Sequence, residues 1–135
     1  MKLRQILLYL FVIGLLVQPS IVRASTETSS QIDQIAFAPL MQYIRSGYAW
    51  LDINGSAATI EARGTSNNRY ISVKATLMRN TSSGWVEVDS YSSSDSGSVL
   101  VSRSFRLVTR GTYRVKAVFS CSGETLTTYS SARTY

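Results

Sequence analysis

The 135-residue sequence contains no histidine and only one cysteine, Cys121. Catalysis by a serine or cysteine nucleophile normally needs a histidine base within hydrogen-bond reach, so both of those arrangements are excluded. Zinc sites that use histidine are excluded as well, and one thiol cannot form an all-thiolate site. A serine–lysine pair would have to use Lys74 or Lys116, which we expect on outward strand faces. We therefore predict a protein that is not an enzyme and that holds no metal or cofactor.

The single cysteine also excludes an intramolecular disulfide. Small secreted domains often depend on disulfides because their cores are limited, so this chain must rely on apolar burial alone. Cys121 is expected near the end of a strand. It is interpreted as an inert free thiol, with a Cys121-linked dimer as the alternative.

Long apolar runs are missing except for Ile6–Val17, which has twelve residues. A membrane-spanning helix needs about 20 residues, so this run is too short to cross a bilayer. Basic residues precede the run, and Val22 and Ala24 occupy the small-residue positions of a cleavage site. This order is typical of a secretory signal peptide over residues 1–24, with a signal anchor as the alternative. We predict a secreted, extracellular product that keeps no stable membrane anchor after cleavage.

Charge is scarce and mixed. Removing residues 1–24 takes away three of the 14 basic residues and none of the 8 acidic ones, so the formal net charge falls from +6 to +3. Nucleic-acid-binding domains usually carry a clustered basic stripe, whereas these charges alternate along the expected strands. We expect no nucleic-acid partner.

Hydrophobic residues alternate with polar ones along most of the chain, and this period of two predicts β-strands. Seven strands are expected, at residues 48–53, 57–63, 70–78, 85–91, 99–108, 112–120 and 125–129. Asn54-Gly55 predicts a hairpin turn, while Gly64–Arg69 and Ser92–Ser98 are predicted as polar connections. Strands at this spacing favour an all-β, two-sheet antiparallel sandwich, with an up-and-down barrel as the alternative.

The domain organisation follows from the same pattern. Residues 25–46 are predicted to form a mobile lead segment, and residues 47–135 the sandwich domain. Within the lead, Ile32–Ile44 has apolar residues at helical spacing, but Pro39 interrupts it, which favours a short helical turn followed by an extended segment. The predicted core takes one phase of each strand: Ile60, Ile71, Val73, Leu77, Val101, Phe105, Val115, Ala117 and Phe119.

The segment Gly111–Ala117 resembles the sixth strand of immunoglobulin and fibronectin type III sandwiches. In those folds a tyrosine near the start of the strand bonds back to the preceding corner, a role that Tyr113 would take here. The resemblance implies an immunoglobulin-like sandwich and says nothing of function.

A second resemblance covers residues 36–135. It is carried by Ala38-Pro39, Leu51-Asp52-Ile53-Asn54-Gly55, Leu77, Gly84-Trp85, Gly111–Ala117 and the terminal Tyr135. In these segments the chain is similar to a family of small secreted β-sandwich proteins from Clostridia and related Gram-positive bacteria, a domain family of unknown function. The resemblance implies bacterial origin, secretion and a sandwich fold, and it assigns no functional residues.

Two sets of side chains suggest sites. Tyr48 and Trp50 share a strand face opposite Leu51 and Ile53, so they could form an exposed aromatic platform for a ligand. The other aromatic residues considered for such a platform are Tyr70, Trp85, Tyr91 and Tyr129. Half-buried packing is the alternative role of such rings.

Glu87 and Asp89 form the second set, because residues two apart on a strand share a face. Paired carboxylates of this kind serve in glycosidases, although neighbouring acids on a solvated strand face are the commoner arrangement.

Together these features predict a secreted, non-enzymatic β-sandwich that binds an extracellular protein or glycan, with Tyr48 and Trp50 as the candidate ligand-binding residues. The alternative is a small secreted antagonist or signalling protein that acts on neighbouring cells.

Overall fold

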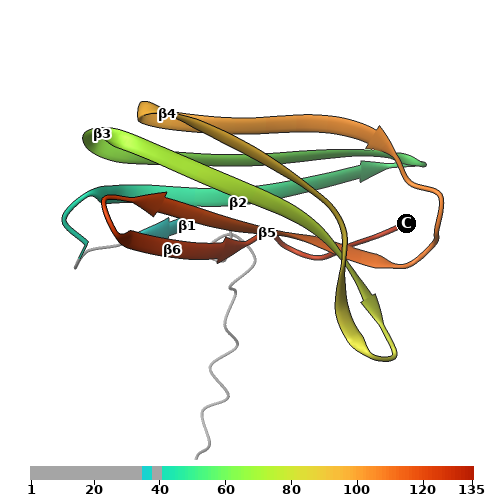
Figure 1. Ribbon diagram of the computed structural model, residues 1–135. Helices are drawn as coiled ribbons and strands as arrows, with labels where there is room; N and C mark the ends of the chain where they lie inside the picture. The colour runs from blue at the N-terminus through green and yellow to red at the C-terminus, as the bar shows by residue number, and fades with distance from the viewer. Residues whose placement is uncertain (1–34, 38–40) are drawn as a thin grey trace, which may run out of the picture.

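A computed structural model describes residues 41–135 and the backbone of residues 35–37 (Figure 1). The described residues contain antiparallel strands and no helix, which confirms the all-β class. The strands are β1 (Ile35–Phe37), β2 (Ile44–Asn54), β3 (Ala57–Thr81), β4 (Gly84–Arg106), β5 (Thr112–Cys121), β6 (Glu124–Tyr129) and β7 (Arg133–Thr134). The predicted signal peptide and residues 25–34 lie outside the described residues, as do residues 38–40 of the predicted lead segment.

One sheet runs through the whole described chain, in the order β1-β2-β3-β5-β6, with β4 paired to β3 and β7 paired to β5. β3 is 25 residues long and changes partners along its length, pairing first with β2 and then with β5. β4 follows β3 over both stretches. The sheet curls over itself, and β2 therefore contacts β5 and β6 across the interior (Figure 1).

We name the two parts by their strands. The first half of the sheet consists of β1, β2, residues 57–65 of β3 and residues 98–106 of β4. The second half consists of residues 70–81 of β3, residues 84–96 of β4, and β5, β6 and β7. The buried side chains lie between the two halves, and each half has an outer face toward solvent.

Two predicted connections are wrong. Gly64–Arg69 and Ser92–Ser98 lie within β3 and β4, where the two strands bend together. The pairing register shifts between Thr65 and Tyr70, and the Ser66 hydroxyl donates to the Arg69 carbonyl (2.5 Å) and accepts from the Arg69 amide (3.1 Å). The polar composition therefore marks a bend in a strand pair and not a chain reversal.

The serine run could not be recognised as a strand from its own residues. It has no apolar alternation, because most of its side chains face solvent at the edge of the sheet. Its backbone nevertheless pairs with residues 65–74 of β3, and only Gly97 has a positive φ, of 77°. The partner strand imposes this structure, since backbone pairing does not depend on side-chain hydrophobicity.

The β2–β3 and β5–β6 turns lie where the sequence predicts chain reversals. The β2–β3 hairpin forms at the predicted place, but Asn54 pairs with Ala57, so its two central residues are Gly55 and Ser56. Only Gly55 has a positive φ (58°), as in a type II′ turn. In the β5–β6 turn both central residues, Ser122 (49°) and Gly123 (84°), have positive φ, as in a type I′ turn.

The predicted core is confirmed at eight of its nine positions, the exception being Phe105, which is half-buried. The Phe105 ring lies at the open β4 edge, where its centroid is 6.4 Å from that of Tyr91. The phase of β4 was assigned correctly, but an edge strand has no neighbour to cover its inner side chains on both sides.

A pair of glycines brings the two halves of the sheet close together. Gly47 and Gly64 are direct partners on the inner face of the first half. A Cβ on Gly64 would lie 2.5 Å from the Phe119 ring, and one on Gly47 would lie 2.7 Å from it. The ring therefore packs directly on the backbone of the two glycines.

Two further contacts hold the ends of strands. Tyr113 is buried and its hydroxyl donates to the Thr109 carbonyl, as the sequence predicted for a corner tyrosine. Glu124, at the start of β6, accepts hydrogen bonds from the amides of Gln42 (2.6 Å), Tyr43 (2.9 Å) and Ile44 (2.9 Å). This carboxylate attaches the beginning of β2 to β6.

Candidate functional site

Tyr48 and Trp50 lie on the outer face of the first half of the sheet, as predicted. Both side chains are half-buried. Leu51, the residue after Trp50, points inward and is buried. The alternation of β2 sets this geometry, because its inner positions, from Gly47 to Ile53, face the core.

The residues paired with the two rings are charged. Trp50 is the direct partner of Glu61, and Tyr48 that of Arg63. The Tyr48 hydroxyl donates to the Glu61 carboxylate. Burial, together with this hydrogen bond and the negative charge of Glu61, raises the pKa of Tyr48 to about 12, while Arg63 acts in the opposite direction. The phenol is thus a neutral donor whose position is fixed by a carboxylate.

The rest of this outer face is polar. Thr59 pairs with Asp52 across β2 and with Ser104 across β4, and the Thr59 and Ser104 hydroxyls lie 3.0 Å apart. Leu100 is the exposed apolar residue of the β4 part of this face, at 50%. Two rings among hydroxyl and charged groups can offer apolar contact and directional hydrogen bonds to the same ligand.

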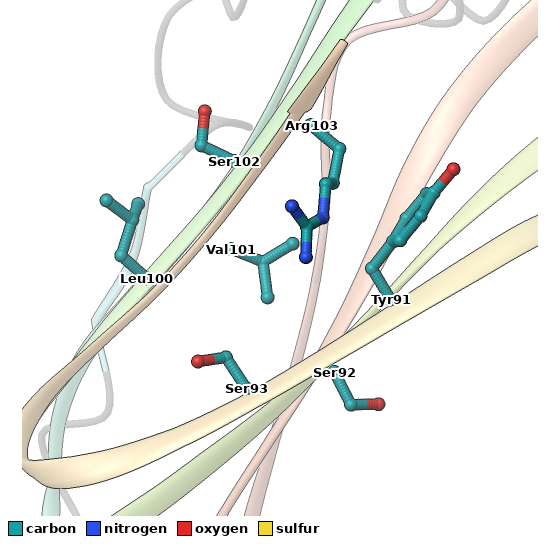
Figure 2. A pocket seen from close by; sticks show the side chains of 7 residues that line it. All are labelled: Tyr91, Ser92, Ser93, Leu100, Val101, Ser102 and Arg103. Carbon is teal, nitrogen blue, oxygen red and sulfur yellow. The ribbon is translucent and has the colours of Figure 1, made fainter. Parts of the chain in front are cut away.

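A second candidate site is a hollow that lies where β4 bends. It has a volume of about 310 Å³ and lies between the two arms of the strand (Figure 2). Figure 2 shows the Arg103 side chain extending between the arms, near Val101 and the Tyr91 ring, with Ser93 on the opposite arm. The Arg103 guanidinium carbon is 5.8 Å from the Tyr91 ring centroid.

This hollow carries little chemistry. Its other lining residues are Leu100 and two exposed serines, Ser92 and Ser102. The Tyr91 hydroxyl donates to Asp89 (2.9 Å), and this hydrogen bond, with burial and the nearby charge, raises the pKa of Tyr91. The hollow has room for a small polar molecule but offers few converging groups.

A third arrangement occupies the outer face of the second half. The Arg114 guanidinium carbon lies 4.1 Å from the Trp85 ring centroid and 4.4 Å from that of Tyr129. Trp85 reaches it from β4 across β3, and Tyr129 reaches it from β6, on the other side of β5. The three side chains form what we call the Arg114 stack.

The predicted carboxylate pair is wrong. Glu87 pairs with Met78 and Asp89 pairs with Leu77, with a register shift between these two pairs. Because adjacent residues of β3 face opposite sides, the shift places Glu87 and Asp89 on opposite faces of the sheet. Asp89 instead accepts hydrogen bonds from the Ser90 amide and the Tyr91 hydroxyl.

Cys121 is a free thiol that is only 2% exposed, at the end of β5. Bonding to a cysteine of a second chain would require it to leave this position. Lys74 and Lys116 lie on the outer face of the second half, as expected from the alternation.

Sequence reasoning found the aromatic pair on β2 but missed the other two arrangements. The serine-rich composition of residues 92–98 predicts a loop, and a loop prediction gives no indication of the β4 hollow. The Arg114 stack unites residues from three strands, and no local pattern links Trp85 with Tyr129. Correct pairing of β3 with β4 and β5 would have revealed it, since the paired positions place all three side chains on one face.

In comparisons with known proteins, no family model, no curated protein and no solved structure matched the chain. The resemblance to the clostridial family therefore stays an expectation. Within residues 41–135, no group of three or more acidic or cysteine side chains is placed to hold a metal ion. Among the residues that the structure describes, no helix has the length and hydropathy to cross a membrane.

Proposed function

We propose that the protein is a secreted, non-enzymatic binding module with an immunoglobulin-like sandwich fold, and that it binds an extracellular glycan through Tyr48 and Trp50. The observation that carries the proposal is the position of these two rings on an outer sheet face, surrounded by polar groups. Both rings are half-buried, so part of each ring stays accessible, and ligand sites commonly combine aromatic side chains with a few polar groups.

The chemistry of the face fits a sugar. Pyranose rings present an apolar face of C–H groups that stacks on aromatic rings, and hydroxyls around the edge that seek hydrogen bonds. Trp50 offers the ring, while Glu61 and Arg63 beside it offer an acceptor and donors. Tyr48 is held by Glu61, so little side-chain freedom is lost when a ligand binds.

The sandwich assignment rests on two features. The halves of the sheet face each other across one core, with β2 against β5 and β6. Tyr113 also makes the hydrogen bond to its preceding corner that is expected of such folds. Secretion rests on the signal-like residues 1–24, and origin in a Gram-positive bacterium rests on the family resemblance alone.

Binding is tested by sedimentation with insoluble peptidoglycan and chitin and by surface capture on mucin. We expect wild-type protein to bind at least one of them and the Tyr48→Ala, Trp50→Ala double variant to lose that binding. Val108→Ala is the control, because Val108 is 90% exposed and lies between β4 and β5, outside both outer sheet faces. Circular dichroism establishes that each variant is folded.

Single variants separate stacking from packing. Tyr48→Phe keeps the ring and loses the hydrogen bond to Glu61, so it should keep most of the binding if stacking dominates. A folded double variant that binds as the wild type does would place the contact elsewhere. Unfolding of both Trp50→Ala and Tyr48→Ala would assign the rings to stability.

Secretion has its own test. N-terminal sequencing of the protein released from its native host should begin at Ser25, because residues 22–24 precede the expected cleavage site. Recovery of a membrane-bound product that retains Met1 would contradict both cleavage and release.

A further inference from the structure

We propose that the outer face of the second half of the sheet is a second binding surface, specific for an anionic polysaccharide, with the Arg114 stack at its centre. This surface lies on the opposite side of the molecule's core from Tyr48 and Trp50. It does not depend on the glycan site proposed there.

The first support is the state of Arg114. Trp85 and Tyr129 contact its guanidinium, and no carboxylate of residues 41–135 pairs with it. Its Nε atom is buried and has no hydrogen-bond partner. A buried donor without a partner is costly, and a methionine or leucine could cover the same strands without that cost. The arginine is therefore not explained by packing alone.

The stack leaves the outer end of the guanidinium available. Its two Nη atoms have no partner in the described part of the chain, and they are not among its buried unpaired atoms. Rings on the guanidinium restrict its motion, so its donors are oriented before a ligand arrives. A fixed, planar set of donors is suited to the paired oxygens of a sulfate or carboxylate group.

The second support is the charge around the stack. Lys116 lies two residues from Arg114 on the same face and is the direct partner of Tyr129. Lys74 lies diagonally opposite Lys116 on β3, at a backbone separation of about 7–8 Å for such positions. Glu87 is the carboxylate that shares this face in residues 41–135, so three cations stand against one anion.

The first half of the sheet provides a contrast, since its outer face balances Arg63 and Arg106 with Asp52 and Glu61. At the paired positions, the excess of positive charge thus lies on the outer face of the second half and not on that of the first.

The third support selects a polysaccharide among anionic partners. The positions around the cations carry mainly hydroxyl groups: Ser72, Ser90, Ser92, Ser94, Ser120, Thr125 and Thr127. A sheet face of this kind extends over several strands and can form many hydrogen bonds to a chain of sugars. It lacks the large apolar surface that would enter a lipid bilayer and the dense basic stripe of a nucleic-acid site.

The test compares two double variants with the same loss of charge. Affinity for heparin, a sulfated polysaccharide, and for polygalacturonate, a carboxylated one, is measured at low salt for Lys74→Gln with Lys116→Gln. The control is Arg45→Gln with Arg106→Gln, because both side chains are exposed, lie in the first half of the sheet and belong to neither proposed site. We expect about a tenfold loss for the first pair and less than about a twofold change for the control.

Arg114→Lys examines the stack, because it keeps the charge and removes the planar set of donors. We expect weaker binding of both polymers with a thermal midpoint close to that of the wild type. Because this variant could lose stability, the lysine pair serves as the independent measurement.

Several outcomes would overturn the proposal. Equal losses for the two double variants would mean that net charge alone drives binding. Equal or tighter binding of anionic vesicles or duplex DNA would assign the face to another partner. We expect the Tyr48→Ala, Trp50→Ala double variant to keep its heparin binding. Loss of heparin binding in that variant would mean that heparin and the glycan proposed above bind to one surface.

Discussion

The two halves of the sheet contribute unequally to the interior they share. At their closest approach the first half presents the backbone of Gly47 and Gly64, while the second half presents the Phe119 ring and the Leu126 side chain. The space left by the absent side chains of the two glycines is filled by the large Phe119 ring of the second half. The distance between the halves is therefore set by a few complementary positions and not by average hydrophobicity.

The two outer faces differ in how their polar side chains are partnered. On the first half the carboxylate of Glu61 satisfies the Tyr48 hydroxyl. On the second half two rings contact Arg114, and no acidic group of residues 41–135 pairs with it. An aromatic residue on a strand face can therefore be a neutral donor that a carboxylate holds, as Tyr48 is, or can orient a charged donor, as the two rings orient Arg114.

The largest effect is expected from Phe119→Ala in the second half. The ring is fully buried against Gly47 and Gly64, so truncation should lower the free energy of unfolding by about 3–5 kcal/mol. Phe105→Ala, at the half-buried edge of the first half, should cost clearly less. Urea unfolding followed by fluorescence measures both. Equal costs would show that the interior does not converge on Phe119.

The second effect comes from filling the opposite side of the same contact. In Gly64→Ala the new methyl group would lie 2.5 Å from the Phe119 ring, so we expect a loss of about 1–3 kcal/mol from overpacking. Combining it with Phe119→Leu should cost less than the sum of the two single changes, because the smaller side chain relieves the clash. Additive costs would contradict the direct contact. Ser102→Ala, on the outer face, should stay within about 0.5 kcal/mol.

The sequence predicted the interior of the sheet well because alternation is a local signal. Each inner position of β5, from Tyr113 to Phe119, follows from period two alone. The same signal placed Tyr48 and Trp50 on an outer face. What it could not supply is the partner of each residue, since pairing depends on strand order.

The errors have the same origin. The sequence predicts a loop at Ser92–Ser98 because the β4 bend has no signature as strong as Asn54-Gly55. It predicts that Glu87 and Asp89 share a face because the irregularity near Val88 has no such signature either. The Gly47–Gly64 pair was missed for a similar reason. A glycine in a strand can mean a bulge or a close approach, and only the facing residue distinguishes them.

A smaller effect is expected at the corner that precedes β5. Tyr113→Phe keeps the buried ring and removes the hydrogen bond to the Thr109 carbonyl. We expect a loss of about 0.5–1.5 kcal/mol, measured by urea unfolding. A Thr109→Ala control leaves that backbone carbonyl in place and should have little effect. An unchanged stability of Tyr113→Phe would mean that the hydroxyl bonds equally well to water.

A local effect is expected where the two halves are joined by Glu124. Burial alone would raise the pKa of this carboxyl, but hydrogen bonds from the amides of Ile44, Gln42 and Tyr43 outweigh it and lower the pKa. Its contribution to stability is therefore complete above the pKa of the unfolded chain and is lost as the pH falls through the folded value.

Hydrogen exchange measures this directly. Protection of the amides of residues 42–44 should fall in acid before that of the core strands, and Glu124→Gln should weaken it at neutral pH. Uniform loss of protection over the whole chain would show that the contact does not act locally.

The smallest effect concerns Tyr48, on the outer face of the first half. Its pKa is raised to about 12, first by burial and then by the hydrogen bond to Glu61 and the charge of that carboxylate. The neutral phenol is favoured in the folded state, so its contribution is complete below the unfolded pKa and decreases as the pH rises toward the folded one. Ultraviolet absorbance measures the ionisation of the tyrosines as the pH is raised. The ionisation step that is absent in Tyr48→Phe belongs to Tyr48, and we expect it at a pH of about 12. Glu61→Gln should move that step to lower pH, because the charge is removed while an acceptor remains. If Glu61→Gln leaves it unmoved, burial alone sets the pKa, and the carboxylate does not hold the ring in the way that distinguishes this face from the Arg114 stack.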